Sequence, residues 1–144
     1  MQRGRRIPNR ELHHGRSCPT VAFVLAATFG HRVAQRIFSD ADAGQVCIYV
    51  PAVVVAEAIM VVQKGRLPGA SLDHLLPHLR AMAVSDNYPL SPLLPETVIA
   101  SPQYTIVPDI FDRLIVTETI SHSVPLVTRD PVIRQSGLIS TIWD

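Results

Sequence analysis

The chain has 144 residues, of which 47% are hydrophobic and 17% are charged, and this composition excludes a disordered protein and fits one compact domain. A formal net charge of +1 excludes a globally basic nucleic-acid-binding protein, so contact with a polyanion must come from a local patch. The two cysteines have no CxxC spacing and no histidines at zinc-finger distance, which favours reduced thiols in the cytoplasm over a disulfide or zinc scaffold.

The first part of the chain, residues 1–18, is basic and contains no apolar run, so we expect a disordered tail in front of one domain over 19–144. Seven apolar residues, 21–27, then begin a helical region, and apolar side chains recur at helical spacing as far as Phe38. Gly44 is expected to end this region.

A β-branched run over residues 46–50 predicts a short buried strand. Pro51 is typical of the first position of a helix, which is expected to reach Lys64 and to end at Gly65. The remaining elements are predicted in the order helix 71–84, edge strand 88–90, short helix started by Pro92 and Pro95, turn-rich stretch 101–108, helix 109–122, strand 124–128, short helix 130–137 and strand 138–143. Short apolar strands that alternate with helices favour a parallel sheet covered on both faces.

Glu57 is the most informative polar residue, because all the remaining residues from 53 to 62 are apolar. The surrounding apolar stretch is too short and too interrupted to span a membrane. Burying a carboxylate without a partner is costly, so Glu57 is expected either to pair with an arginine or to belong to a metal or catalytic site. The second interpretation is favoured.

Two aspartates near the carboxyl end are further candidates. Asp112 lies one turn into the last long helix, and Asp130 follows the strand that comes next. Both have a structural explanation, since Asp109 can cap the first helix with Asp112 near its positive end, and Asp130 can cap the second. If the fold brings Glu57, Asp112 and Asp130 together, however, their like charges require a cation, and oxygen ligands select Mg²⁺ or Mn²⁺. Such a site favours phosphodiester hydrolysis.

Several stretches, in this order, resemble the PIN domain family. Residues 107–116 (Val-Pro-Asp-Ile-Phe-Asp-Arg-Leu-Ile-Val) and 124–130 (Val-Pro-Leu-Val-Thr-Arg-Asp) look like its carboxyl-terminal signature. Residues 50–57 resemble the segment that carries the second acidic residue of the family, and 139–143 are similar to the last strand of VapC-type toxins. The resemblance extends from about residue 20 to residue 143.

The resemblance implies a three-layer α/β/α domain with a parallel sheet of four to five strands. It also implies a Mg²⁺- or Mn²⁺-dependent ribonuclease centre, in which Glu57, Asp112 and Asp130 match catalytic metal ligands and Thr128 matches a nearby hydroxyl residue. Asp109 is given a peripheral role, through capping or a water-mediated contact. The implied partners are RNA and a cognate antitoxin that blocks the nuclease, with no membrane involved and a homodimer left open.

The chain departs from the family at its amino-terminal end. Pro19 stands where a first strand should end in an aspartate, although Thr20 and the apolar helix after it match. The first strand is expected to be degraded, and a truncated or frame-altered reading frame is the hypothesis for it. The alternative function is therefore a catalytically impaired PIN-fold protein that still binds antitoxin or RNA. Glu118, six residues after Asp112, is expected to be exposed rather than to replace the missing ligand.

Overall fold

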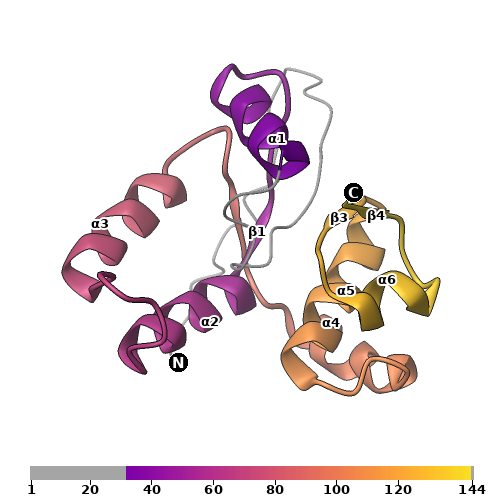
Figure 1. The fold of residues 1–144 in the computed structure, drawn as a ribbon. Coiled ribbons are helices and arrows are strands. Elements are labelled where there is room, and N and C mark those ends of the chain that lie inside the picture. The colour runs from indigo at the N-terminus through magenta and orange to yellow at the C-terminus, as the bar shows by residue number, and fades with distance from the viewer. Residues whose placement is uncertain (1–31, 144) are drawn as a thin grey trace, which may run out of the picture.

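The computed structural model describes residues 32–143, and the predictions for the basic tail, Pro19, Thr20 and residues 21–27 lie outside this range. The described elements follow one another as α1 (Arg32–Asp42), β1 (Val50–Pro51), α2 (Ala52–Gln63), α3 (Leu72–Ala83), β2 (Leu90–Ser91), α4 (Pro95–Ala100), the 3₁₀ helix η1 (Ser101–Tyr104), α5 (Ile110–His122), β3 (Leu126–Val127), α6 (Pro131–Ser136) and β4 (Thr141–Ile142) (Figure 1). None of these helices is long and apolar enough to cross a membrane.

Local capping signals set the ends of several helices. Ser71 accepts a hydrogen bond from the backbone N–H of His74 at the start of α3, and Asp130 accepts one from Ile133 at the start of α6. Gly137 follows α6 with φ 69°, a left-handed conformation that glycine adopts without strain. The predicted bounds of α3 and α6 are therefore confirmed to within one residue at each end.

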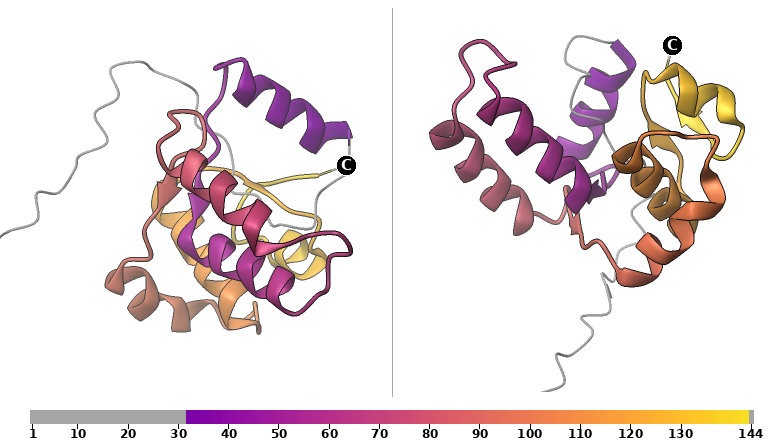
Figure 2. Two further views of the ribbon diagram at one scale, coloured as in Figure 1. Left: turned by 90° about the vertical axis from the view of Figure 1, so that its left-hand side faces the viewer. Right: turned by 90° about the horizontal axis from the view of Figure 1, so that it is seen from below.

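The strands form two separate parallel pairs, β1 with β2 and β3 with β4. Their parallel direction is as predicted, but the predicted single sheet of four to five strands is not formed by residues 32–143. Each pair is closed by its own crossover, through α2 and α3 in the first and through α6 in the second. The connection through α4 and α5 leads from one pair to the other without forming a ladder. Figures 1 and 2 show α2 and α3 on one side of the molecule and α4, α5 and α6 on the other.

One apolar core joins the two pairs of strands. It contains Ile48 from the segment before β1, Val53 from α2, Ile115 from α5 and Leu126 from β3. Helix α5 is buried around its whole circumference in its middle part, because the six consecutive residues 114–119 span more than one and a half turns and all are buried. It is therefore the central helix of the described fold.

The prediction that Glu118 is exposed is wrong. This residue of α5 is only 2% exposed, and Ser91 at the end of β2 donates a hydrogen bond to its Oε1. Its Oε2 has no hydrogen-bond partner among residues 32–143. Burial raises the pKa of Glu118, and the hydrogen bond from Ser91 opposes this rise. The prediction required α5 to have a solvent-facing side at this position, and the burial of all residues from 114 to 119 leaves none there.

Candidate metal centre

Helix α2 carries Glu57 toward the interior of the domain. Pro51 ends β1 and precedes the helix with φ −61° and ψ 144°, so the chain changes from strand to helix at this residue. Val53 is buried in the core, and Glu57 lies one turn later on the same side of the helix. The half-buried carboxylate consequently faces the body of the domain.

The first turn of α5 supplies two further carboxylates. Asp109 precedes the helix, and its Oδ1 accepts hydrogen bonds from the backbone N–H of Phe111 at 2.9 Å and of Asp112 at 3.1 Å. The predicted cap is therefore confirmed. Asp112 is three residues further on, a spacing that places two side chains on neighbouring positions of one helix face. Asp109 is exposed, whereas Asp112 is half-buried.

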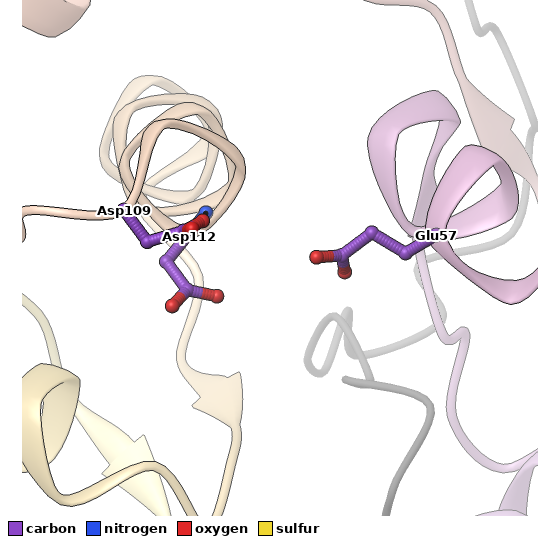
Figure 3. Close-up of side chains that lie close together, drawn as sticks. All are labelled: Glu57, Asp109 and Asp112. Atoms are coloured by element: carbon purple, nitrogen blue, oxygen red, sulfur yellow. Dashed lines mark hydrogen bonds between the residues drawn. The ribbon is translucent and has the colours of Figure 1, made fainter. Parts of the chain in front are cut away.

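Glu57, Asp109 and Asp112 converge at one place, where each offers a carboxylate oxygen and these oxygens all lie within 4.8 Å of one another. Figure 3 shows Glu57 extending from α2 toward Asp109, which precedes α5, and Asp112 in its first turn. No lysine or arginine within residues 32–143 forms an ion pair with any of the three, so the alternative of a Glu57–arginine pair is not realised in this range. Three carboxylates without a counter-charge from the described residues suit a hard divalent cation such as Mg²⁺ or Mn²⁺.

The pKa values of Glu57 and Asp112 are raised, by burial and by the like charges close to them. Burial raises the pKa of Glu57 from 4.5 to about 7, with further contributions from Asp112 and Asp109. Burial likewise raises the pKa of Asp112 from 3.8 to about 6, and the charges of Asp109 and Asp130 add to this rise. Burial and the neighbouring carboxylates thus make Glu57 and Asp112 harder to ionise, and a bound cation would oppose that effect.

Asp130 and Thr128 follow β3. Thr128 is fully buried, and its Oγ1 accepts a hydrogen bond from the backbone N–H of Asp130 at 3.0 Å. Asp130 in turn accepts a bond of 3.0 Å from the N–H of Ile133 and so caps α6. Asp130 is not one of the three mutually close carboxylates, although its charge contributes to the raised pKa of Asp112. Its role as a metal ligand, and that of Thr128 beside the site, remain predictions.

Capping by Asp130 can be tested separately from metal binding. We expect Asp130→Ala to lower the free energy of unfolding by about 1 kcal/mol, because the N–H of Ile133 loses its acceptor. Asp130→Asn should remain close to the unchanged protein, since asparagine caps a helix as well as aspartate does. Urea denaturation of both variants measures this difference, and an equal loss in the two would mean that the negative charge, rather than the cap, is what stabilises α6.

Asp109 was not predicted to belong to the acidic group. A peripheral role was expected for it, because a helix cap explains an aspartate at that position. The structure shows that the cap occupies Oδ1 alone, and a carboxylate has lone pairs for further partners. One signal in the sequence could have identified the group. It is the pair of aspartates three residues apart at the start of a helix, together with Glu57 on a separate apolar helix.

The sequence was also compared with known proteins. No protein-family model matches it. The comparison with curated proteins gives no match either.

Proposed function

We propose that the protein is a metal-dependent endoribonuclease of the PIN type, related in kind to the VapC toxins that its sequence resembles. The observation that supports this most is the convergence of Glu57 from α2 with Asp109 and Asp112 from α5, without a basic side chain among the described residues to neutralise them. Carboxylates from segments far apart in the sequence are held together despite their repulsion. A bound divalent cation would neutralise this repulsion and so explain the arrangement.

The residues of the site have distinct roles in this proposal. Glu57 and Asp112 would hold the cation from two different helices, and Asp109 would complete the set of oxygen donors. A bound Mg²⁺ or Mn²⁺ lowers the pKa of a water and stabilises negative charge on the phosphoryl oxygens of RNA. Asp130, which already influences the pKa of Asp112, would add negative charge beside the site. Thr128 would keep Asp130 in position through the hydrogen bond to its backbone.

The predicted sheet of four to five strands is part of the same proposal. It requires a further strand between β1 and β3, which are the more buried strand of each pair. Such a strand would join the two pairs that residues 32–143 form separately.

A second function is favoured by one specific observation. Pro19 stands where the family has its first aspartate, so the site has one carboxylate fewer than the resemblance implies. Loss of that ligand lowers the negative charge around the metal and weakens the activation of water. The second proposal is therefore a catalytically impaired PIN-fold protein that binds RNA or a cognate antitoxin, the partner expected of a VapC-type toxin.

Cleavage of single-stranded RNA oligonucleotides by the full chain in Mn²⁺ tests the first proposal. Glu57→Gln and Asp112→Asn are each expected to lower the cleavage rate by about 100-fold or more, because each removes an anionic metal ligand at nearly constant side-chain size. Glu96→Gln is the matched control, since Glu96 is an exposed carboxylate on α4.

The outcomes separate the two proposals. Cleavage that EDTA and both site variants abolish, but that Glu96→Gln leaves intact, supports the nuclease. Cleavage that survives Glu57→Gln would come from a contaminating enzyme and would contradict it. Retained RNA binding without cleavage supports the impaired form.

A further inference from the structure

Arg113 has an unusual set of contacts for an arginine next to an acidic group. It follows Asp112 directly, yet its guanidinium donates to two backbone carbonyls, from Nε to Val107 at 2.9 Å and from Nη2 to Pro108 at 3.0 Å. It forms no ion pair with Asp109 or Asp112. Its donors are therefore directed to the loop before α5 and leave the carboxylates available.

The two carbonyls belong to the residues immediately before Asp109. Val107 is 1% exposed and packs in the core, and Pro108 restricts the loop because its ring fixes its own φ angle. Because Arg113 itself sits in the first turn of α5, its side chain ties the loop to the helix that follows. The backbone N–H of Arg113 also donates to the carbonyl of Asp109 at 2.9 Å.

These contacts determine where the carboxylate of Asp109 lies. Its Oδ1 is held by the N–H groups of Phe111 and Asp112, so the side chain keeps its orientation only while the loop and the first helical turn stay in register. Arg113 supplies two hydrogen bonds across that junction. The planar guanidinium can reach two carbonyls at once, which a lysine ammonium on its flexible stem does poorly.

We propose that Arg113 is a positioning residue of the metal centre, which holds Asp109 at the distance from Glu57 and Asp112 that a divalent cation requires. This inference rests on the proposed function, because it assumes that the acidic group binds a cation. Residues that orient a metal ligand without touching the metal commonly change affinity by about 10- to 100-fold when they are replaced.

The charge of Arg113 allows a direct test, because two explanations of its role predict opposite changes in Mn²⁺ affinity when it is replaced. If Arg113 acted only as a nearby positive charge, Arg113→Gln would relieve repulsion of the cation and tighten Mn²⁺ binding. If it positions Asp109, Arg113→Gln should weaken Mn²⁺ binding by about 10-fold or more. Arg113→Lys keeps the charge and the aliphatic stem but loses the two-carbonyl fork, and it should weaken binding as well.

The experiment is a titration of the full chain with Mn²⁺. Binding is followed by calorimetry and by the loss of the electron paramagnetic resonance signal of free Mn²⁺. Arg80→Gln is the matched control, because Arg80 is an exposed arginine on α3. Ser71→Ala removes the cap of α3 and lowers stability at a distance from the site, so it reports whether destabilisation alone alters binding. Both controls are expected to bind Mn²⁺ as the unchanged protein does.

The outcomes of the Mn²⁺ titration distinguish failure of the positioning role from failure of the metal centre. Weaker binding in both Arg113 variants, with both controls unchanged, supports the positioning role. Binding that is unchanged in Arg113→Lys, or tighter in Arg113→Gln, overturns this inference and leaves the proposed metal centre in place. Absence of Mn²⁺ binding by the unchanged protein overturns the metal centre itself, together with this inference.

Discussion

Manganese ions are expected to raise the melting temperature of the full chain strongly at pH 8 and only slightly at pH 5. The pKa of Glu57 is raised to about 7 and that of Asp112 to about 6, so both carry protons at pH 5 that a cation would have to displace. At pH 8 both are ionised and repel one another. A metal at 100 times its dissociation constant stabilises a folded protein by about 2.7 kcal/mol, which for a chain of this size is roughly 10 °C.

The metal-free protein should show the opposite dependence on pH. A carboxylate whose pKa is raised in the folded state contributes stability below its ordinary value, and this contribution is lost as the pH rises through the folded value. For Glu57 and Asp112 the loss falls between about pH 4 and pH 7. Thermal unfolding in EDTA, measured across this range, therefore gives the unligated reference curve for the metal experiment.

Glu57→Gln provides the decisive comparison for this prediction. Without metal at pH 8 the variant should be at least as stable as the unchanged protein, because one member of the repelling group has lost its charge. With metal its melting temperature should rise far less. A manganese response of the same size in Glu57→Gln and in the surface control Glu96→Gln would contradict the metal centre.

Replacing Glu118 with glutamine is expected to have the second large effect. Glu118 is 2% exposed, its Oε2 has no hydrogen-bond partner in the part of the chain that the structure describes, and burial raises its pKa. A buried acceptor left without a partner costs about 1–3 kcal/mol, and more when it is charged. We therefore expect Glu118→Gln to raise the free energy of unfolding at pH 8 by an amount in this range and to leave it nearly unchanged at pH 4.

The sign of this change in the free energy of unfolding follows from the direction in which the pKa of Glu118 is shifted. The stability that protonated Glu118 contributes is present below its ordinary pKa of 4.5 and is lost as the pH rises through the raised value in the fold. Glutamine does not titrate, so the difference between the two proteins should grow with pH. The neighbouring His122, whose Nε2 lies 3.8 Å from Glu118 Oε1, has a pKa lowered by burial and does not supply a compensating charge at pH 8.

Urea denaturation at several pH values measures this effect, and Ser91→Ala offers a second variant. The hydroxyl of Ser91 donates to Glu118 and favours its charged form, so its removal should make the loss of stability with rising pH steeper. If Glu118→Gln were less stable than the unchanged protein at pH 8, the negative charge of Glu118 would have to be stabilising, and the inference that burial makes this charge costly would be wrong.

Much of the local structure could be read from the sequence. Ser71, Asp109 and Asp130 each cap the helix for which they were the predicted start, and Gly137 ends the last one. A cap depends on side-chain and backbone groups a few residues apart, so the local sequence contains all the partners. The same holds for the apolar surroundings that singled out Glu57.

The tertiary structure decided everything that depends on partners far apart in the chain. The strands pair as two short parallel ladders, and the middle of α5 is enclosed on all sides and buries Glu118. Asp109 joins Glu57 and Asp112, while Asp130 lies outside that group. Strand pairing, burial and the approach of carboxylates from α2 and α5 are set by packing between segments. Residue spacing within a segment carries no information on how closely two segments pack, so these features could be known only once the chain was folded.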